Sequence, residues 1–304
     1  MIREGRINTV ELDLKDEGGD IWYATEVPLA NQIGAVTELY DLEAVVEELH
    51  RMGVRVIGRL VCFRDPRLAE YAVESGQLDL VVQNPDGTAM SKYGGFTNPF
   101  HPTVREYNIA IAEEAARMGV DDIMYDYVRR PDENIELMRF PGQDGTPVEA
   151  IVEFLDQSQD RVHDAGARLS AAVFGVAASR PEEIAQDIPR MSRHVDYIAP
   201  MLYPSHWNPG EYGVADPNSQ PYDIVYRSLV DLQEQMAGTE ATVVAWLQDF
   251  SLGVEYGVPE VQAQIQAAHD VGVEDFLLWD AATTYTSAAL EPWVREEGAE
   301  TGGG

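Results

Sequence analysis

Strand-like apolar runs alternate with helical segments along most of the chain. A capping box spans Thr146 to Glu149, and glycines such as Gly119 and Gly272 stand where a helix would end just before the next run. Alternating strands and helices predict a parallel sheet and therefore the α/β fold class. The strand-like runs are INTVELDL, VRVIGRLVCF, DDIMYDYV, RLSAAVFGV, VDYIAPMLY, TVVAWLQDF and DFLLWDA.

A parallel sheet of this kind is either an open, doubly wound sheet or a closed barrel. An open sheet that binds nucleotides would carry a glycine fingerprint after an early strand, and the stretch LDLKDEGGDI does not match one. Polar and aromatic residues instead gather at the carboxyl ends of nearly all the runs, where barrel enzymes place their chemistry. The pattern therefore predicts a (β/α) TIM-type barrel.

The visible runs number seven, whereas a closed barrel of this type has eight strands. The first residues, MIREG, have the pattern of a last helical turn and its terminal glycine, followed at once by a strand. We therefore expect a barrel that lacks its first βα unit, with a gap between the strands that contain Val10 and Leu277. Residues 1–297 are expected to form one catalytic barrel domain, and residues 298–304 a flexible glycine-rich tail.

The charge of the chain limits its partners. Its 53 acidic and 21 basic residues give a formal net charge of −32. Such a surface repels phosphate backbones and anionic lipid, so nucleic acid is not expected as a partner. No apolar run approaches the roughly 18 residues of a membrane span, and the start lacks the apolar stretch of a signal peptide. An acidic shell of this kind is also typical of a halophilic protein.

Strand alternation predicts which side chains face the barrel interior. The three runs that matter most are VELDLKD, IGRLVCF and IMYDYVRRP. The expected inward residues are Glu11, Asp13 and Lys15 in the first, Arg59, Val61 and Phe63 in the second, and Met124 and Asp126 in the third. Asp126 should therefore lie at the mouth of the barrel, near its middle strands.

Seven motifs follow one another in an order that resembles a known family: LDLKDEGG, RLVCFRDP, DGTAMSKYGGFTNPFHPTVREYN, IMYDYVRRP, MLYPSHW, AWLQDF and LLWDA. Together they resemble the putative glycoside hydrolase domain family, a bacterial group of barrel proteins that is distantly similar to alpha-amylase-type barrels. The resemblance runs from about Ile7 to about Tyr285. It implies hydrolysis of O-glycosyl bonds in a polysaccharide or oligosaccharide, and an extracellular or cell-envelope location. It does not supply the sugar.

Hydrolysis of a glycosidic bond requires two carboxyl groups, one of which protonates the leaving oxygen. We predict Asp126 as the principal catalytic carboxylate, held in its ionised form by Arg129, whereas Arg130 is expected at the surface. A purely structural Asp126 would instead be a helix cap or an ion-pair partner. The stretch AAVFGVA lies in the fourth visible run, which is the fifth strand position of a barrel that lacks its first strand. It offers no glutamate at the place where alpha-amylase-type barrels keep their general acid.

The second carboxylate has two leading candidates, Asp13 and Asp16, on the first visible strand. Both could instead belong to an ion-pair network with Lys15 and Arg59 inside the barrel. Arg59 is expected to orient the acids. Asp249 and Asp280 are reserve candidates at later strand ends.

Sugar binding calls for flat aromatic faces beside hydrogen-bonding groups. The expected sugar contacts at the strand ends are Tyr203, His206, Trp246, Gln248 and Trp279. The six histidines lack the spacing of a metal site, and the single cysteine, Cys62, cannot build a multi-cysteine site. No cofactor or metal is therefore expected.

Three other functions remain open for a barrel of this kind. A phosphate-binding enzyme would need glycine-rich turns after the last two strands, where LQDFSLG and WDAATTY are poor cradles. A Schiff-base aldolase would need a buried lysine, for which Lys15 is the candidate. A catalytically inactive carbohydrate-binding barrel is the strongest alternative, because it differs from the enzyme only in lacking a carboxylate pair of suitable separation.

Overall fold

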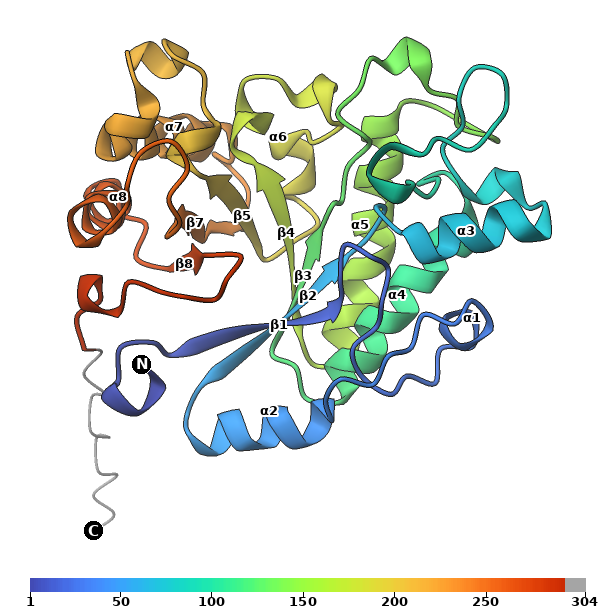
Figure 1. The fold of residues 1–304 in the computed structure, drawn as a ribbon, viewed down its shortest axis with the longest axis horizontal. Helices are drawn as coiled ribbons and strands as arrows, with labels where there is room; N and C mark the ends of the chain where they lie inside the picture. Colours follow the sequence, from blue (N-terminus) through green and yellow to red (C-terminus); the bar gives the residue numbers. More distant parts are fainter. Residues whose placement is uncertain (293–304) are drawn as a thin grey trace.

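The computed structural model describes residues 1–292, and the structural statements below refer to that part of the chain. One parallel sheet runs through it, with helices on its outer side (Figure 1). The strands are β1 (Thr9–Lys15), β2 (Arg55–Val61), β3 (Asp122–Asp126), β4 (Arg168–Phe174), β5 (Tyr197–Leu202), β6 (Thr242–Val243), β7 (Ala245–Gln248) and β8 (Phe276–Trp279). The expected tail, residues 298–304, lies outside the described residues.

The helices begin and end largely where the sequence signals indicate. They are α1 (Pro28–Gln32), α2 (Leu42–Arg51), α3 (Pro66–Ser75), α4 (Pro102–Arg117), α5 (Pro147–Asp164), α6 (Ile188–Met191), α7 (Pro221–Gln235) and α8 (Val258–Asp270). The predicted capping box of Thr146 and Glu149 opens α5, with a proline in the first turn. Gly119 and Gly272, just after α4 and α8, have φ values of 96° and 77°, which glycine adopts at little cost.

The strands follow the order β1-β2-β3-β4-β5-β7-β8, and the short β6 pairs with β5. Val244, which separates β6 from β7, also bonds to β5, because its N–H donates to the Ile198 carbonyl at 3.0 Å. We therefore count β6 and β7 as one interrupted strand position. The sheet then has seven positions, all joined in parallel.

The sheet is open between its two ends. β1 and β8 end the strand order, and no β-ladder joins them within residues 1–292. Arg6 reaches across this side of the molecule, donating from Nη1 to the carbonyls of Ser287 and Leu290. The prediction of a TIM-type barrel that lacks one unit, with a gap between the strands containing Val10 and Leu277, is confirmed.

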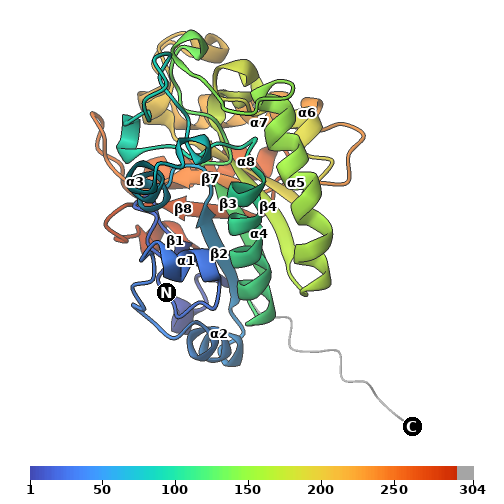
Figure 2. The ribbon, with the colours of Figure 1, turned by 90° about the vertical axis from the view of Figure 1, so that its right-hand side faces the viewer.

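The outer face of the sheet packs on the long helices α4 and α5, which lie side by side against β2, β3 and β4 (Figure 2). Tyr125 of β3 stacks on Phe154 of α5 with ring centroids 4.9 Å apart. Met124 belongs instead to the interior cluster with Ile57 and Trp246. The predicted alternation along β3 is therefore confirmed. Phe63 was expected inside, but its ring packs edge-on against Phe154, because β2 ends at Val61 and alternation no longer applies beyond it.

Lys15 also faces the opposite way from the prediction. Asp13 pairs with Arg59, but the next registered pair is Lys15 with Leu60, so a bulge interrupts β1 between them. The extra residue turns Lys15 to the helix side. Its Nζ lies 2.8 Å from Asp65 Oδ2 and 2.8 Å from Asn108 Oδ1. Lys15 is therefore part of a buried structural ion pair, which removes it as a Schiff-base candidate inside the barrel.

Candidate active site

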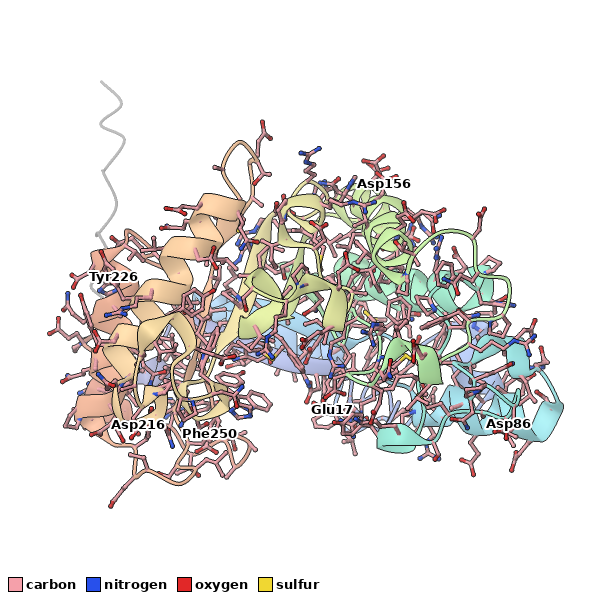
Figure 3. All side chains as sticks on the ribbon, turned by 90° about the horizontal axis from the view of Figure 1, so that it is seen from above. Glu17, Asp86, Asp156, Asp216, Tyr226 and Phe250 are labelled. Carbon is pink, nitrogen blue, oxygen red and sulfur yellow. The ribbon has the colours of Figure 1, made fainter. Side chains whose placement is uncertain are left out.

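A cavity of about 920 Å³ opens at the carboxyl ends of the strands. Its carboxylates are Glu17, Asp126, Asp132, Glu133, Glu182 and Glu183, and its arginines are Arg59, Arg130 and Arg180. Its rings are Tyr127, Phe174, Tyr203, His206, Trp207, Trp246 and Trp279. Figure 3 views the molecule from above and shows Glu17 on the same edge as Phe250, whose ring packs on Tyr203 and His206.

Arg59 lies at the centre of the charged part of this cavity and is 2 % exposed. Its Nη2 and Nε lie 2.6 and 3.0 Å from Asp126 Oδ2. Its Nη1 donates to Asp13 Oδ1 at 2.7 Å, and Nη2 also donates to Glu17. One guanidinium therefore holds three carboxylates, which come from β1, the loop after β1, and the end of β3. Covalent geometry then limits the separation of Asp13 Oδ1 from Asp126 Oδ2 to at most about 8 Å.

The second oxygen of Asp126 is held by the backbone. The N–H of Tyr127 donates to Asp126 Oδ1 at 2.6 Å. Tyr127 has a φ of 48°, a left-handed conformation that is uncommon for a residue with a side chain. Its ring packs near the guanidinium groups of Arg129 and Arg64, at 4.6 and 5.3 Å from the centroid. These contacts stabilise a strained turn that orients the Asp126 carboxylate.

The pKa values of the other two carboxylates on Arg59 are shifted in opposite directions. Burial raises the pKa of Asp13, despite the opposing attraction of Arg59. Burial alone would also raise the pKa of Glu17, but the charge and the hydrogen bond of Arg59 outweigh it and lower that pKa. Glu17 lines the cavity, whereas Asp13 does not belong to its wall. Asp13 is therefore the better proton donor, and Glu17 is the more accessible carboxylate.

A fourth carboxyl group, Glu11, lies one inward position below Asp13 on β1, opposite Ile57. Its Oε2 is shielded from solvent and has no hydrogen-bond partner among the described residues. Burial raises the pKa of Glu11 to about 8; Arg59 opposes this shift, and the negative charges of Asp13 and Asp126 add to it. The neutral form of Glu11 is therefore favoured to a higher pH than that of an ordinary carboxyl group.

Asp16 lies outside the cavity wall, although it was a candidate for the second carboxylate. Its Oδ1 accepts from the N–H groups of Gly18 and Asp20 at 2.8 and 3.0 Å. Its Oδ2 accepts from Trp22 Nε1 at 3.0 Å. Both oxygens are used to close the loop after β1, so the structure gives Asp16 a structural position.

The two arginines after β3 are placed differently from the prediction. Arg129, expected to hold Asp126, is buried beside the Phe174 ring at 4.3 Å and donates to the Arg130 carbonyl at 3.0 Å. Burial lowers the pKa of Arg129 from its ordinary value. The side chain that binds Asp126 is Arg59. Arg130, expected at the surface, is buried and lines the cavity, where its guanidinium donates to the carbonyls of Pro131, Glu133 and Glu182.

Four of the five predicted sugar contacts line the cavity together: Tyr203, His206, Trp246 and Trp279. The Trp246 and Trp279 rings meet edge to face at 5.5 Å, and so do those of Tyr203 and His206. Burial lowers the pKa of His206, which favours the neutral imidazole. The Arg59 guanidinium lies 5.6 Å from the Trp279 centroid, so the aromatic wall adjoins the carboxylate cluster.

Gln248, the fifth predicted contact, does not line the cavity. It is fully buried, and its Oε1 accepts from the Ser205 N–H at 3.0 Å and from the Ser205 hydroxyl at 2.8 Å. Its Nε2 donates to the Phe250 carbonyl at 2.8 Å. Gln248 therefore holds the loop that carries His206.

The reserve carboxylates also lie outside the cavity wall. Asp249 Oδ2 accepts from the Thr286 N–H at 2.7 Å, and its Oδ1 is buried without a hydrogen-bond partner among the described residues. Asp280 Oδ1 accepts from the Ala282 N–H at 2.5 Å. Both therefore order the turns near β8. Within residues 1–292, no cluster of three or more His, Cys, Asp and Glu side chains has an arrangement that could bind a metal ion.

Sequence reasoning missed Glu17 and Tyr127, and it assigned no role to Glu11. Glu17 stands in the DLKDEGG stretch that already supplied Asp13 and Asp16, but it lies in a loop where alternation does not predict direction. Tyr127 follows Asp126 directly, but a tyrosine in the sequence gives no indication that its φ is positive. Glu11 was expected to face the interior, but the sequence gives no indication that one of its carboxyl oxygens is left without a hydrogen-bond partner among the described residues.

Residues 1–285 match the family described as "Putative glycosyl hydrolase domain". No curated protein matches the chain. No helix among the described residues has both the length and the apolar character required to cross a membrane.

Three solved structures illustrate the similarity. A hypothetical protein from Ruminiclostridium thermocellum is 33% identical, with 54% of this chain and 83% of that chain covered and a TM-score of 0.48. The PgaB (BpsB) glycoside hydrolase domain from Bordetella bronchiseptica is 14% identical, with 92% and 86% covered and a TM-score of 0.64. The spore cortex-lytic enzyme SleL from Bacillus cereus is 12% identical, with 93% and 66% covered and a TM-score of 0.52. The last two share the fold with this chain.

Proposed function

This chain belongs to the family of putative glycosyl hydrolase domains, and we propose from that premise that it hydrolyses O-glycosyl bonds in a polysaccharide or oligosaccharide. One observation supports the proposal most strongly. Asp126, at the end of β3, lines a cavity of about 920 Å³ and is held at both oxygens, by Arg59 and by the Tyr127 N–H. A fixed carboxylate beside aromatic rings is what attack on a sugar ring requires.

Asp126 acts as the nucleophile or the base in this proposal, because its carboxylate is oriented by charged and backbone donors. Asp13 supplies the proton to the leaving oxygen, because burial raises its pKa. The upper limit of about 8 Å on their separation includes the spacing of about 5 Å in retaining enzymes and part of the 6.5–9.5 Å range of inverting ones. Glu17 shares Arg59 and contributes negative charge to the cavity wall.

The aromatic wall binds the sugar rings in this account. Trp279 is partly exposed and adjoins Arg59, so a sugar stacked on it would lie beside Asp126. His206 and Tyr203 complete the same wall. The catalytic unit in this proposal is residues 1–297, of which 293–297 lie outside the described residues. Its proposed place of action is extracellular or in the cell envelope, where polymeric sugars are met. Immunodetection in fractionated cells tests the location.

A second candidate is a barrel that binds carbohydrate without cleaving it. One observation favours it: Asp13 is absent from the cavity wall, and both wall carboxylates of the cluster, Glu17 and Asp126, are paired with Arg59. A cavity without an accessible proton donor would bind sugar and leave the bond intact.

The deciding experiment screens a panel of bacterial and plant polysaccharides for binding and for release of new reducing ends. The enzyme proposal predicts release by the native chain and loss of release in Asp126→Asn. Asp144→Asn is the matched control, because Asp144 is an exposed acid that does not line the cavity. Binding of a polysaccharide without new reducing ends would support the binding-only barrel.

A further inference from the structure

Glu11 and Asp13 lie on the same inward face of β1, two residues apart, opposite Ile57 and Arg59 of β2. Asp13 reaches the guanidinium with a hydrogen bond of 2.7 Å. Glu11 lies one layer deeper and makes no such bond, and its Oε2 is shielded from solvent without a partner in residues 1–292. A buried carboxyl oxygen of this kind is costly to leave ionised.

The charges around Arg59 do not balance if all of its neighbours are ionised. Asp13, Glu17 and Asp126 each accept a hydrogen bond from the one guanidinium, and Glu11 adds a fourth carboxyl group beside it. The single positive charge of Arg59 would offset only one of these four negative charges. Asp13, Glu17 and Asp126 each have a donor, whereas the shielded Oε2 of Glu11 has none among the described residues. A proton is therefore held at the least cost by Glu11.

The remaining groups that face Glu11 supply no second positive charge. They are the hydroxyl groups of Tyr197 and Tyr203 on the β5 side and of Tyr285 after β8. The Tyr197 hydroxyl is itself buried without a partner among the described residues. The pKa of Glu11, raised by burial to about 8 despite Arg59, agrees with this geometry.

We propose that Glu11 is a positioning residue that must keep its proton for Arg59 to hold Asp13 and Asp126 in their working geometry. This proposal deepens the proposed function and rests on it wherever the readout is hydrolysis. When Glu11 loses its proton, it becomes a fourth anion beside Arg59, competes for the guanidinium and repels the other carboxylates. Part of the alkaline limb of the activity profile then belongs to a residue that never touches the sugar.

The first test compares kcat/KM across pH in the native chain and in Glu11→Gln, which mimics the protonated side chain. Above about pH 8 the native value should fall by about tenfold more per pH unit than loss of the Asp13 proton alone would cause, and this additional fall should be absent from Glu11→Gln up to about pH 9. Asp249→Asn is the matched control, because Asp249 is also buried with one unpaired oxygen but lies outside the cavity wall. It should keep the additional fall. An unchanged additional fall in Glu11→Gln would overturn the proposal.

The second test measures stability and needs no substrate. Unfolded, Glu11 would lose its proton near its ordinary pKa of 4.5, whereas in the folded protein it keeps the proton until about pH 8. Between pH 4.5 and about pH 8 the folded state then binds more protons than the unfolded state. The contribution of Glu11 to the free energy of unfolding therefore falls as pH rises through this range, and it stays constant at higher pH. The melting temperature of the native chain minus that of Glu11→Gln should follow this course.

The outcomes separate the two proposals. A pH-independent difference in melting temperature would overturn the role of Glu11 whatever the activity. A difference that follows the predicted course, with no polysaccharide cleaved, would leave Glu11 as the proton holder and defeat the hydrolase proposal. If Glu11→Gln fails to fold, infrared spectra of the native chain provide the test. The band of a protonated carboxyl group should disappear between about pH 7 and pH 9. A spectrum in which no such band disappears over this range would contradict the proposal.

Discussion

The guanidinium of Arg59 donates two hydrogen bonds to a single oxygen of Asp126, at 2.6 and 3.0 Å. The other oxygen is left for the Tyr127 N–H, so the carboxylate is fixed from two sides. Both partners come from the barrel itself: Arg59 from β2 and Tyr127 from the first residue after β3. This arrangement concentrates the site on the ion pair of Arg59 with Asp126.

Arg59→Lys should lower kcat/KM by about 100-fold or more, because an ammonium is a point charge that cannot hold three carboxylates in one plane. It should also reduce the free energy of unfolding by about 1–3 kcal/mol, since hydrogen bonds to buried charges are lost. Kinetics and denaturant unfolding measure the two effects. Arg67→Lys is the control: Arg67 forms a half-exposed pair with Asp20, for which at most about 1 kcal/mol is expected. Equal effects in the two variants would argue against a central role for Arg59.

Tyr127→Gly should keep a higher kcat than Tyr127→Ala. Glycine adopts the φ of 48° at no steric cost, so the backbone N–H that orients Asp126 stays in place. Alanine favours a negative φ, which moves this N–H away from the Asp126 carboxylate. Both variants lose the ring, so packing cannot explain a difference in this direction. Tyr93, with a φ of 53° and no place in the cavity wall, provides the same pair of substitutions as a control and should leave kcat unchanged. A lower kcat in Tyr127→Gly than in Tyr127→Ala would contradict the account.

Trp279→Ala should raise KM about tenfold with a smaller change in kcat, because stacking on a sugar ring acts in the ground state and the transition state alike. Trp279→Phe should restore most of the affinity. The partly buried stacked pair of Tyr222 with Tyr226, outside the cavity wall, supplies the control Tyr222→Ala. Steady-state kinetics on the cleaved polysaccharide measure all three. A fall in kcat at constant KM would remove Trp279 from the binding wall.

Stability should rise with ionic strength, because the net charge of −32 makes the folded shell repel itself. Screening shortens from about 10 Å at 0.1 M salt to about 3 Å at 1 M. Thermal melts in low and high potassium chloride measure the effect, and each kcal/mol gained should raise the melting temperature by about 2–4 °C. A midpoint that is level or falls with added salt would count against the halophilic interpretation.

The barrel and the interior position of Asp126 could be predicted because both depend on regular periodicity. Alternation places Met124 and Asp126 inside as long as β3 stays a strand, and the aromatic residues at the strand ends follow the same geometry. Trp246 and Trp279 meet in the cavity for this reason.

The errors arose where the chain leaves that periodicity. A bulge in β1 turns Lys15 outward, and Phe63 lies beyond the end of β2. Arg129 follows the strained turn at Tyr127, and its guanidinium packs on the Tyr127 and Phe174 rings instead of pairing with Asp126. Gln248 stands at a strand end as predicted, but its amide is fully used by the backbone and by a serine. The residue type alone does not indicate which hydrogen-bond partners a strand-end side chain will have.

The catalytic assignment of Asp126 is tested most directly by kcat/KM of Asp126→Asn, measured well below its melting temperature. The temperature matters because Asp126 is a buried partner of Arg59, so the loss of its charge-assisted hydrogen bonds should also destabilise the fold by about 1–3 kcal/mol. On the polysaccharide that the native chain cleaves, a fall of about 1,000-fold or more is expected in folded Asp126→Asn, with Asp144→Asn at the native value. A folded Asp126→Asn that keeps activity within about tenfold of native would contradict the central claim.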